Sequence, residues 1–399
     1  MRSLREHIAW YRAQEYIGKY KPYGIVVAGT YGRENASQAI LHALRRHRHV
    51  RSANRIEHAI DIPEGILGAR SHSEHKGIFR MLVQSKMREL TQFEPDTIIT
   101  QLPLVIPPHT APWALSRLLP RMLVLTNIGL EHIDLFVNKD RIAHEYLVLA
   151  NSLHGDGLVV ANADDEYLRE LCEYMHRPVI TYGVHPKADV RISRAARAKD
   201  ATGLFLEIVV HGTHHELFLP HLFAKQHVSA VAAGIAAAHG MGVGMQDAIQ
   251  GLHTMKPHRS ALSHGVGASG VQIIDDSYNT CPEQLESSVK SFATLSCAGK
   301  KILVLGDMDL LATFGPEKHE AVAKQAVAIA QLTLFVGPMM RRGQDSALAA
   351  GTQNDTHHFV SSEEAAAWLV EHVQKDDLVF VSGGKSMDMG KVVKRLKAK

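Results

Sequence analysis

The chain has 399 residues, of which 45% are hydrophobic and 21% are charged, and its formal net charge is +3 with neutral histidines. This length exceeds what one hydrophobic core usually organises, so we expect two domains with a small appendage. A charge so close to balance excludes electrostatic attraction to nucleic acid or to a membrane surface as the basis of its main interaction. The three cysteines lie far apart and form no CxxC pair. This pattern argues against a disulfide framework or a thiolate metal site and favours a reducing cytoplasm.

The first 21 residues carry charges throughout and lack the apolar core of a signal peptide, so we expect a short helical extension over residues 1–21. No stretch of the chain approaches the roughly 20 apolar residues of a membrane span. Histidine is unusually frequent, and it gathers in "HGTHHE" (211–216) and "DTHHF" (355–359). Because neither cluster has carboxylates or cysteines at the spacing of a tetrahedral site, we favour solvated surface over a metal site.

From residue 22 to 255, short β-rich runs alternate with longer helical patterns, which is typical of a parallel sheet covered by helices. The expected strands are 24–29, 96–100, 122–128 and 157–164, with helices over 34–47 and 139–153. The sequence pattern changes at 188–220, where three β-rich runs separated by polar turns predict an antiparallel excursion from the parallel sheet. An alanine-rich helix then begins at residue 225 and is followed by a turn at 255–260.

We place the domain boundary at this turn, which gives a central domain of 22–255 and a C-terminal domain of 256–399. The second domain alternates more cleanly, with strands expected at 271–278, 301–308, 332–337 and 378–384 and helices beginning at Pro282, Pro316, after "SSEE" and near the end of the chain. The predicted fold class is therefore α/β. A phosphate-loop-type central domain with a mostly parallel sheet precedes a Rossmann-like C-terminal domain.

The stretch "IVVAGTYGRENASQAI" (25–40) has the layout of a phosphate-binding loop, because a buried strand passes through a glycine-rich turn into a helix. Gly29, Thr30 and Gly32 keep the turn. An alternative of equal weight is a plain strand-to-helix connection, in which the glycines serve only its tightness.

The two residues after this turn depart from the phosphate-loop pattern. Arg33 and Glu34 stand where such a loop has a lysine followed by a hydroxyl. Arginine keeps the charge, but its planar guanidinium is bulkier than an ammonium, and a carboxylate repels phosphate unless a cation intervenes. Asn35 supplies an amide where another hydroxyl is expected, or lies near a helix N-cap.

Polar side chains follow several predicted strands, where open α/β sheets bind ligands. The stretches are "TNIGLEHIDLF" (126–136), "IIDDSYNTCPE" (273–283), "VLGDMD" (304–309) and "VSGGKSMDM" (381–389). The second releases five polar residues together, which is hard to explain as packing. We expect the last three stretches to line a crevice at one edge of the second sheet.

The order of these motifs resembles the Mur ligase family, most closely its members that add D-alanyl-D-alanine to the peptidoglycan precursor. The resemblance is carried by "AGTYGRENA", "TNIGLEHIDLF", "GLVVANADD", "KQHVSAVAAGIAAA", "PHRS", "IIDDSYNTCPE", "LVLGDMDLL" with His319 after it, and "VSGGKSMDM". They cover the chain from about residue 22 to its end. The family's N-terminal domain, which grips the uridine nucleotide of the precursor, is therefore expected to be absent. A protein partner that supplies it is one expectation.

The resemblance implies amide-bond formation through phosphorylation of a carboxylate, with ATP and Mg²⁺ as cofactors. It places the family's loop lysine at Arg33 and its hydroxyl neighbours at Glu34 and Asn35. The family's magnesium-holding glutamate corresponds to Gln101, and its carbamylated lysine corresponds to Tyr146. An amide and a phenol bring no anion for a hard cation, so both mark lost metal-supporting positions.

Other family positions are retained. His132 matches a metal-linked histidine, and Arg259 and Asp276 match residues that contact the nucleotide from the C-terminal domain. The resemblance implies a substrate-side group of Ser277, Tyr278, Asn279, Asp307 and Lys385. The departures from the family pattern are concentrated at the positions that would contact phosphate and metal.

Two functions stay open. The first is a Mur-ligase-like protein whose ATP-dependent ligation is lost or strongly altered, and which keeps a small-molecule or peptide ligand in the interdomain crevice or binds a partner protein without needing a cofactor. The second is an active ATP- and Mg²⁺-dependent amide ligase with an atypical loop, in which Arg33 replaces the lysine and Glu34 holds the metal ion. We favour the first, because the residue changes at the loop, at the metal-binding carboxylate and at the carbamylated lysine all point to loss of the family's chemistry.

Overall fold

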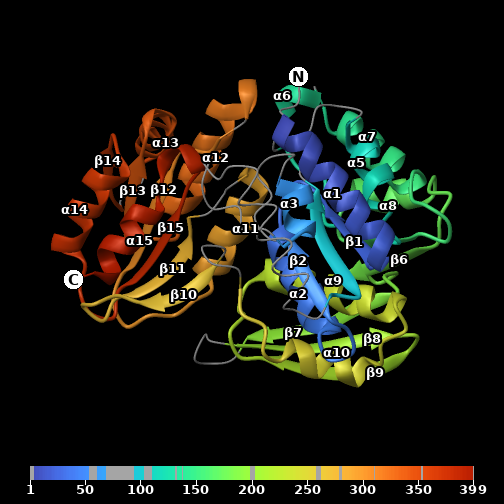
Figure 1. Cartoon of the computed structure of the whole chain (residues 1–399). Coiled ribbons are helices and arrows are strands. Elements are labelled where there is room, and N and C mark those ends of the chain that lie inside the picture. The colour runs from blue at the N-terminus through green and yellow to red at the C-terminus, as the bar shows by residue number, and fades with distance from the viewer. Residues whose placement is uncertain are drawn as a thin grey trace.

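A computed structural model shows the chain as two lobes, each built on its own sheet (Figure 1). It describes residues 4–53, 61–68, 94–102, 110–130, 133–136, 138–197, 203–257, 262–277, 281–309, 311–351 and 354–398. Within these residues, no helix is long and apolar enough to cross a membrane.

The first lobe contains a mixed sheet with a parallel core. In spatial order its strands are β2 (Val50–Ala53), β3 (Thr97–Leu102), β1 (Tyr23–Ala28), β4 (Met122–Leu125), β5 (Leu158–Asn162), β6 (Val179–Gly183), β7 (Val190–Arg197), β8 (Leu204–Val210) and β9 (Thr213–Leu219). The strands from β2 to β7 pair in parallel, whereas β7, β8 and β9 form an antiparallel meander. The carboxyl ends of the parallel strands therefore share one edge of the sheet.

Helices cover both faces of this sheet. One face carries α1 (Leu4–Tyr20), α3 (Asp61–Ile66), α5 (Thr110–Leu118), α6 (Ile133–Phe136), α7 (Lys139–Asn151) and α8 (Glu166–Cys172). The other face carries α2 (Arg33–Leu44), α9 (Lys225–Gly240) and α10 (Met245–Leu252). Alternate residues of β1 enter the two cores: Val26 packs on the first face and Ile25 and Val27 on the second. This burial on both faces explains why β1 reads as a continuous apolar run.

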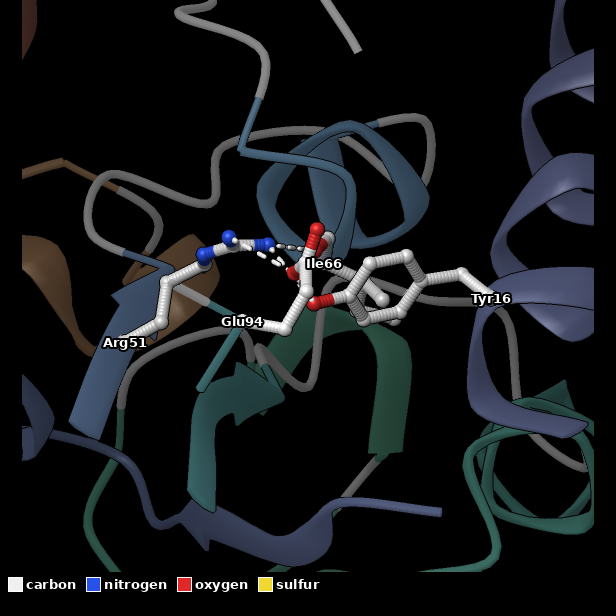
Figure 2. A network of polar contacts seen from close by, with 4 residues as sticks. All are labelled: Tyr16, Arg51, Ile66 and Glu94. Atoms are coloured by element: carbon white, nitrogen blue, oxygen red, sulfur yellow. Dashed lines mark hydrogen bonds and ion pairs between the residues drawn. The ribbon is translucent and has the colours of Figure 1, made fainter. Parts of the chain in front are cut away.

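A polar network fastens α1 to the rim of the sheet (Figure 2). The Tyr16 hydroxyl donates to the Glu94 carboxylate, and Arg51 on the edge strand β2 lies 3.4 Å from the same carboxylate. Arg51 also donates to the Ile66 carbonyl at 2.8 Å, which ties in the end of α3. Burial, followed by the hydrogen bond to Glu94, raises the pKa of Tyr16. The helix expected in residues 1–21 is thus an integral part of this layer.

The second lobe contains a six-stranded sheet in the described part of the chain, in the order β10 (Ser263–Val266), β11 (Gln272–Asp276), β15 (Leu378–Ser382), β12 (Lys301–Gly306), β13 (Leu332–Val336) and β14 (Asp355–Phe359). All neighbours are parallel except β10 and β11. One face packs on α11 (Pro282–Ala293), α12 (Gly315–Val327) and α13 (Pro338–Ala349), and the other on α14 (Ser362–His372) and α15 (Gly390–Lys397). Single 3₁₀ turns lie at Ala312–Phe314 and Lys385–Met387.

The two lobes touch through α9 and α11, which lie next to each other in Figure 1. Phe223 and Ala224, which precede α9, belong to the apolar core of the second lobe. Lys139 at the start of α7 forms a salt bridge of 3.2 Å with Glu283 in the first turn of α11. These contacts set the distance between the two sheet edges that carry the site.

The predicted fold class is confirmed: both sheets are mostly parallel, with an antiparallel excursion at 190–219. The sequence reading missed the short strands β2, β6, β10 and β14. The cluster at 355–359, interpreted as solvated surface, is the edge strand β14, and its His357 packs on Trp368 at 4.5 Å between ring centroids. The boundary between residues 255 and 256 stays a prediction.

Candidate nucleotide site between the two domains

The turn between β1 and α2 needs its glycines. Gly29 has φ +147°, and a Cβ atom there would lie 1.9 Å from Thr126 Oγ1. Gly32 has φ +79° and is the N-cap of α2. Side chains other than hydrogen are strained at such angles, so the tight turn that the sequence predicts is present.

Asn127, which follows β4, holds this turn from the side. Its backbone carbonyl accepts from the Thr30 N–H at 3.1 Å, and its Oδ1 accepts from the Tyr31 N–H at 3.0 Å. Its Nδ2 donates to the Tyr31 carbonyl at 2.8 Å, and Thr126 Oγ1 donates to the same oxygen at 2.8 Å. Two backbone N–H groups of the turn are therefore engaged within the protein.

The Arg33 guanidinium turns back onto its own loop. It donates to the Thr30 carbonyl at 2.9 Å and to the Gly29 carbonyl. The adjacent cavity is lined by Tyr31 and Gly32 but not by Arg33. In this arrangement the positive charge is directed at the loop's carbonyl oxygens.

A cavity of about 280 Å³ lies between the two domains. The central domain contributes the phosphate-type loop, the residues after β4 and β5, and the first turn of α9. The C-terminal domain contributes α11 and Asp276 at the end of β11. A concave site at the carboxyl ends of parallel strands and at a domain interface is the usual position for a small ligand.

Among the described residues, carboxylates outnumber cations in the wall of this cavity, yet most of these carboxylates already have partners. Asp164 accepts two backbone N–H groups after β6, and Asp165 caps α8 and accepts from the Ile128 N–H at 2.9 Å. Burial raises the pKa of Asp165. Glu283 is engaged by Lys139 across the interface. Each of these carboxylates has a structural role independent of a ligand.

Asp276 is the most deeply buried of them, with 1% of its surface exposed. Its Oδ2 accepts from the Ser288 hydroxyl at 2.8 Å, and its Oδ1 accepts from the Leu262 N–H at 3.2 Å. Burial raises the pKa of Asp276 to about 8, and the charge of Asp275 adds to the shift. A carboxyl that titrates near neutral pH in a cleft is a candidate for ligand contact.

The residues predicted to lie on the substrate side have different surroundings in the structure. Ser277 donates its hydroxyl to Asp275 at 2.6 Å, next to the cavity. The Asp307 carboxylate accepts from two N–H groups at the start of α13, at 3.1 and 2.7 Å, and so caps that helix. Lys385 is exposed in a 3₁₀ turn. The substrate-side assignment of this group stays a prediction, and its members Tyr278 and Asn279 lie outside the described residues. So do His132, predicted to be linked to a metal ion, and Arg259, predicted to contact the nucleotide.

Two family models match this chain. The Mur ligase middle domain matches residues 111–238, and the glutamate ligase domain of Mur ligases matches residues 258–384. The chain belongs to the Mur ligase family. These matches extend on both sides of the cavity, so the cavity lies between the two domains that define a Mur ligase.

Curated Mur ligases resemble the chain over part of their length. It is 27% identical over 287 residues to UDP-N-acetylmuramoyl-tripeptide–D-alanyl-D-alanine ligase of Bacillus subtilis, covering 71% of the chain and 60% of the relative. It is 24% identical to UDP-N-acetylmuramate–L-alanine ligase of Rhizobium johnstonii, covering 66% and 58%. The chain thus spans about 60% of the length of these relatives.

Solved structures show the same fold. MurF from Thermotoga maritima in complex with ADP has a TM-score of 0.80 at 18% identity, covering 98% of this chain and 83% of that one. MurF from Acinetobacter baumannii has a TM-score of 0.79 at 16% identity, covering 99% and 80%. Folylpolyglutamate synthase from Mycobacterium tuberculosis, also with ADP, has a TM-score of 0.68 at 12% identity, covering 99% and 95%.

The two positions expected to have lost Mur ligase metal support differ in their surroundings. Gln101 is buried near the carboxyl end of β3, in register with Val27 beside the loop. Tyr146 is fully buried in the apolar core between the sheet and α7. Neither side chain provides an anion for Mg²⁺.

The loop positions predicted to face a magnesium triphosphate have other contacts in the described residues. Arg33 and two loop N–H groups are engaged within the protein, and Glu34 lies in the first turn of α2, outside the cavity wall. No group of three or more His, Cys, Asp or Glu side chains converges on a metal position within the described residues. The described wall of the cavity still offers polar side chains, among them Asn35, Asn162 and Ser229.

Sequence reasoning missed several residues that build the site. Asn127, Glu283 and Gln226 lie in stretches that had been singled out, but their roles depend on contacts across the sheet edge or the interface. Ser288 stands in a helix with no distinguishing pattern. Only the register of α11 against β11 reveals that it faces Asp276.

Proposed function

We propose that this chain binds a nucleotide-type ligand in the interdomain cavity and that its ATP-dependent ligation is lost or strongly altered. The observation that carries the proposal is Arg33, whose guanidinium is bonded to the carbonyl oxygens of its own loop. A bound polyphosphate needs that charge directed outward, toward its own oxygens.

The ligand class follows from the family and from the cavity wall. Two of the similar structures that share this fold contain ADP, and the wall offers hydroxyl, amide and carboxyl groups of the kind that hold a nucleoside. The retained carboxyl of Asp276 supports the nucleoside end, whereas Gln101 and Tyr146 leave the metal end without its anions. Ligand binding is thereby separated from phosphoryl transfer.

The alternative is an active amide ligase with an atypical loop. It is supported by the match to both catalytic domains of the family and by the intact cavity. Activity would require Arg33 to leave the loop carbonyls and Glu34 to hold Mg²⁺. The substrates to offer are those named for the Bacillus subtilis relative, UDP-N-acetylmuramoyl-tripeptide and D-alanyl-D-alanine.

Calorimetry with ADP and ATP, with and without Mg²⁺, tests the proposal together with a phosphate-release assay on those substrates. We expect binding that changes little with Mg²⁺ and no phosphate release. Ser229→Phe, which would place a ring in the cavity, should abolish binding, whereas Gln250→Phe on the exposed side of α10 should not.

Magnesium-dependent micromolar ATP binding with phosphate release would refute the loss of ligation and establish the active alternative. Absence of binding for every nucleotide would refute the ligand class.

A further inference from the structure

A continuous chain of hydrogen bonds crosses the interface and ends at the cavity. It begins at Gln226 in the first turn of α9, whose Nε2 donates to Ser288 Oγ at 2.9 Å. Ser288 in α11 then donates to Asp276 Oδ2 at 2.8 Å. Gln226 and Asp276 both line the cavity, whereas Ser288 is fully buried behind them.

The neighbouring groups determine which atom donates and which accepts in each of these hydrogen bonds. Gln226 Nε2 also faces the Gln284 carbonyl at 3.2 Å, and a carbonyl oxygen only accepts, so the NH₂ group of the amide must point toward α11. Ser288 Oγ accepts from this NH₂ group, which leaves its proton for Asp276. Donation into the hydroxyl also strengthens the bond that the hydroxyl makes.

Asp276 has two other hydrogen-bond partners in the described part of the protein, Leu262 and Ser382. Its second carboxyl oxygen accepts from the Leu262 N–H, and its backbone carbonyl accepts from Ser382 on β15. Among the described residues, the charge of Asp275 on its own strand disfavours ionisation, while Lys225, Glu283, Asp164 and Asp165 line the same cavity. Ser382 also acts as a side-chain partner that lowers the pKa of Asp276, while Ser288 is the side-chain donor on α11, the helix that contacts the other domain.

We propose that Ser288 and Gln226 are positioning residues, which hold the Asp276 carboxyl at the cavity wall and make its orientation depend on contact between the two domains. This inference rests on the proposed function, because it takes the cavity as the ligand site. A ligand with hydroxyl or N–H donors facing Asp276 would then bind best when α9 and α11 are in contact. These hydrogen bonds from Gln226 through Ser288 to Asp276 link ligand binding directly to contact between the two domains.

The test uses the full chain and ADP as the probe, with the affinity measured from pH 6.5 to 9. Ser288→Ala should weaken ADP binding about tenfold, since a hydrogen bond to a carboxylate is lost. Gln226→Met keeps the side-chain length without the NH₂ group and should weaken binding about threefold. Ser291→Ala is the matched control, because this serine of α11 bonds only its own helix through its hydroxyl, at Ser287.

Two readouts separate positioning from packing. If Gln226 acts through Ser288, Gln226→Met should have no further effect in the Ser288→Ala background. Removal of the donor should also move the pH midpoint of binding upward, because the ionised carboxyl loses a stabilising partner. Additive effects, or an unchanged midpoint, would overturn the inference while the proposed function stands.

If the wild-type chain binds no ADP, the proposed function fails first. The hydrogen-bond chain is then judged on the ligand-free protein, through the pH dependence of urea unfolding. A higher pH at which stability levels off in Ser288→Ala, but not in Ser291→Ala, would uphold the positioning role. Identical curves for the two variants would overturn it.

Discussion

Replacement of Asp276 by asparagine should stabilise the protein at alkaline pH. The folded state holds the Asp276 proton up to about pH 8, whereas the ordinary pKa of an unfolded aspartate is 3.8. The native state therefore binds more protons than the unfolded state between these values, so the free energy of unfolding falls as pH rises through this window. Below pH 3.8 the contribution is fully present, and above pH 8 it is fully lost.

The magnitude follows from the width of the window. Each pH unit inside it lowers the free energy of unfolding by about 1.4 kcal/mol, so this residue accounts for roughly 3 kcal/mol between pH 6 and 8. Asparagine keeps the shape and stays neutral, so Asp276→Asn should remove that part of the slope.

Urea unfolding followed by circular dichroism at pH 6, 7, 8 and 9 measures the effect. Glu317→Gln removes an exposed carboxylate of the same domain and serves as the control. We expect the Asp276→Asn curve to diverge upward from wild type with rising pH and the Glu317→Gln curve to run parallel to it. Parallel curves for all three proteins would refute the raised pKa and the reasoning built on it.

Three further variants test the loop and the first helix. Arg33→Lys combined with Glu34→Thr should raise ATP affinity about tenfold in the presence of Mg²⁺, as measured by calorimetry, and an unchanged affinity would place the defect elsewhere in the site. Gly29→Ala should destabilise the fold by at least about 3 kcal/mol in urea titrations, because its methyl group would overlap Thr126; a wild-type midpoint would contradict the turn geometry. Tyr16→Phe should cost about 1 kcal/mol in thermal unfolding through loss of the hydrogen bond in Figure 2, and no shift would show that the bond contributes nothing net.

The parts of the fold that could be predicted are those with strong local signals. Strands buried on both faces, such as β1 and β12, read as apolar runs, and the turn at Gly29 and Gly32 carries its own pattern. Edge strands such as β10 and β14 were missed, because their half-exposed residues carry little periodic signal. Their pairing depends on the neighbouring strand, which no local pattern records.

The sequence pointed to the stretches that line the candidate cavity, but not to the hydrogen bonds that their side chains form. The stretches around Arg33 and Asp276 identified the two facing edges. The sequence could not show that Arg33 bends back or that Ser288 lies behind Asp276, since both depend on side-chain direction across elements distant in the chain. Pattern reasoning finds the residues that a site contains, whereas contacts decide what those residues do.

The position of Phe223 and Ala224 in the core of the second lobe has a consequence for how this protein can be divided. A fragment cut at the predicted boundary near residue 255 would leave a large aromatic side chain behind and open a hole in the apolar core that it normally fills. Such a fragment should expose apolar surface and aggregate, even if its own sheet is otherwise stable. Recombination between homologous genes would meet the same constraint, so these two residues should be inherited together with the C-terminal sheet.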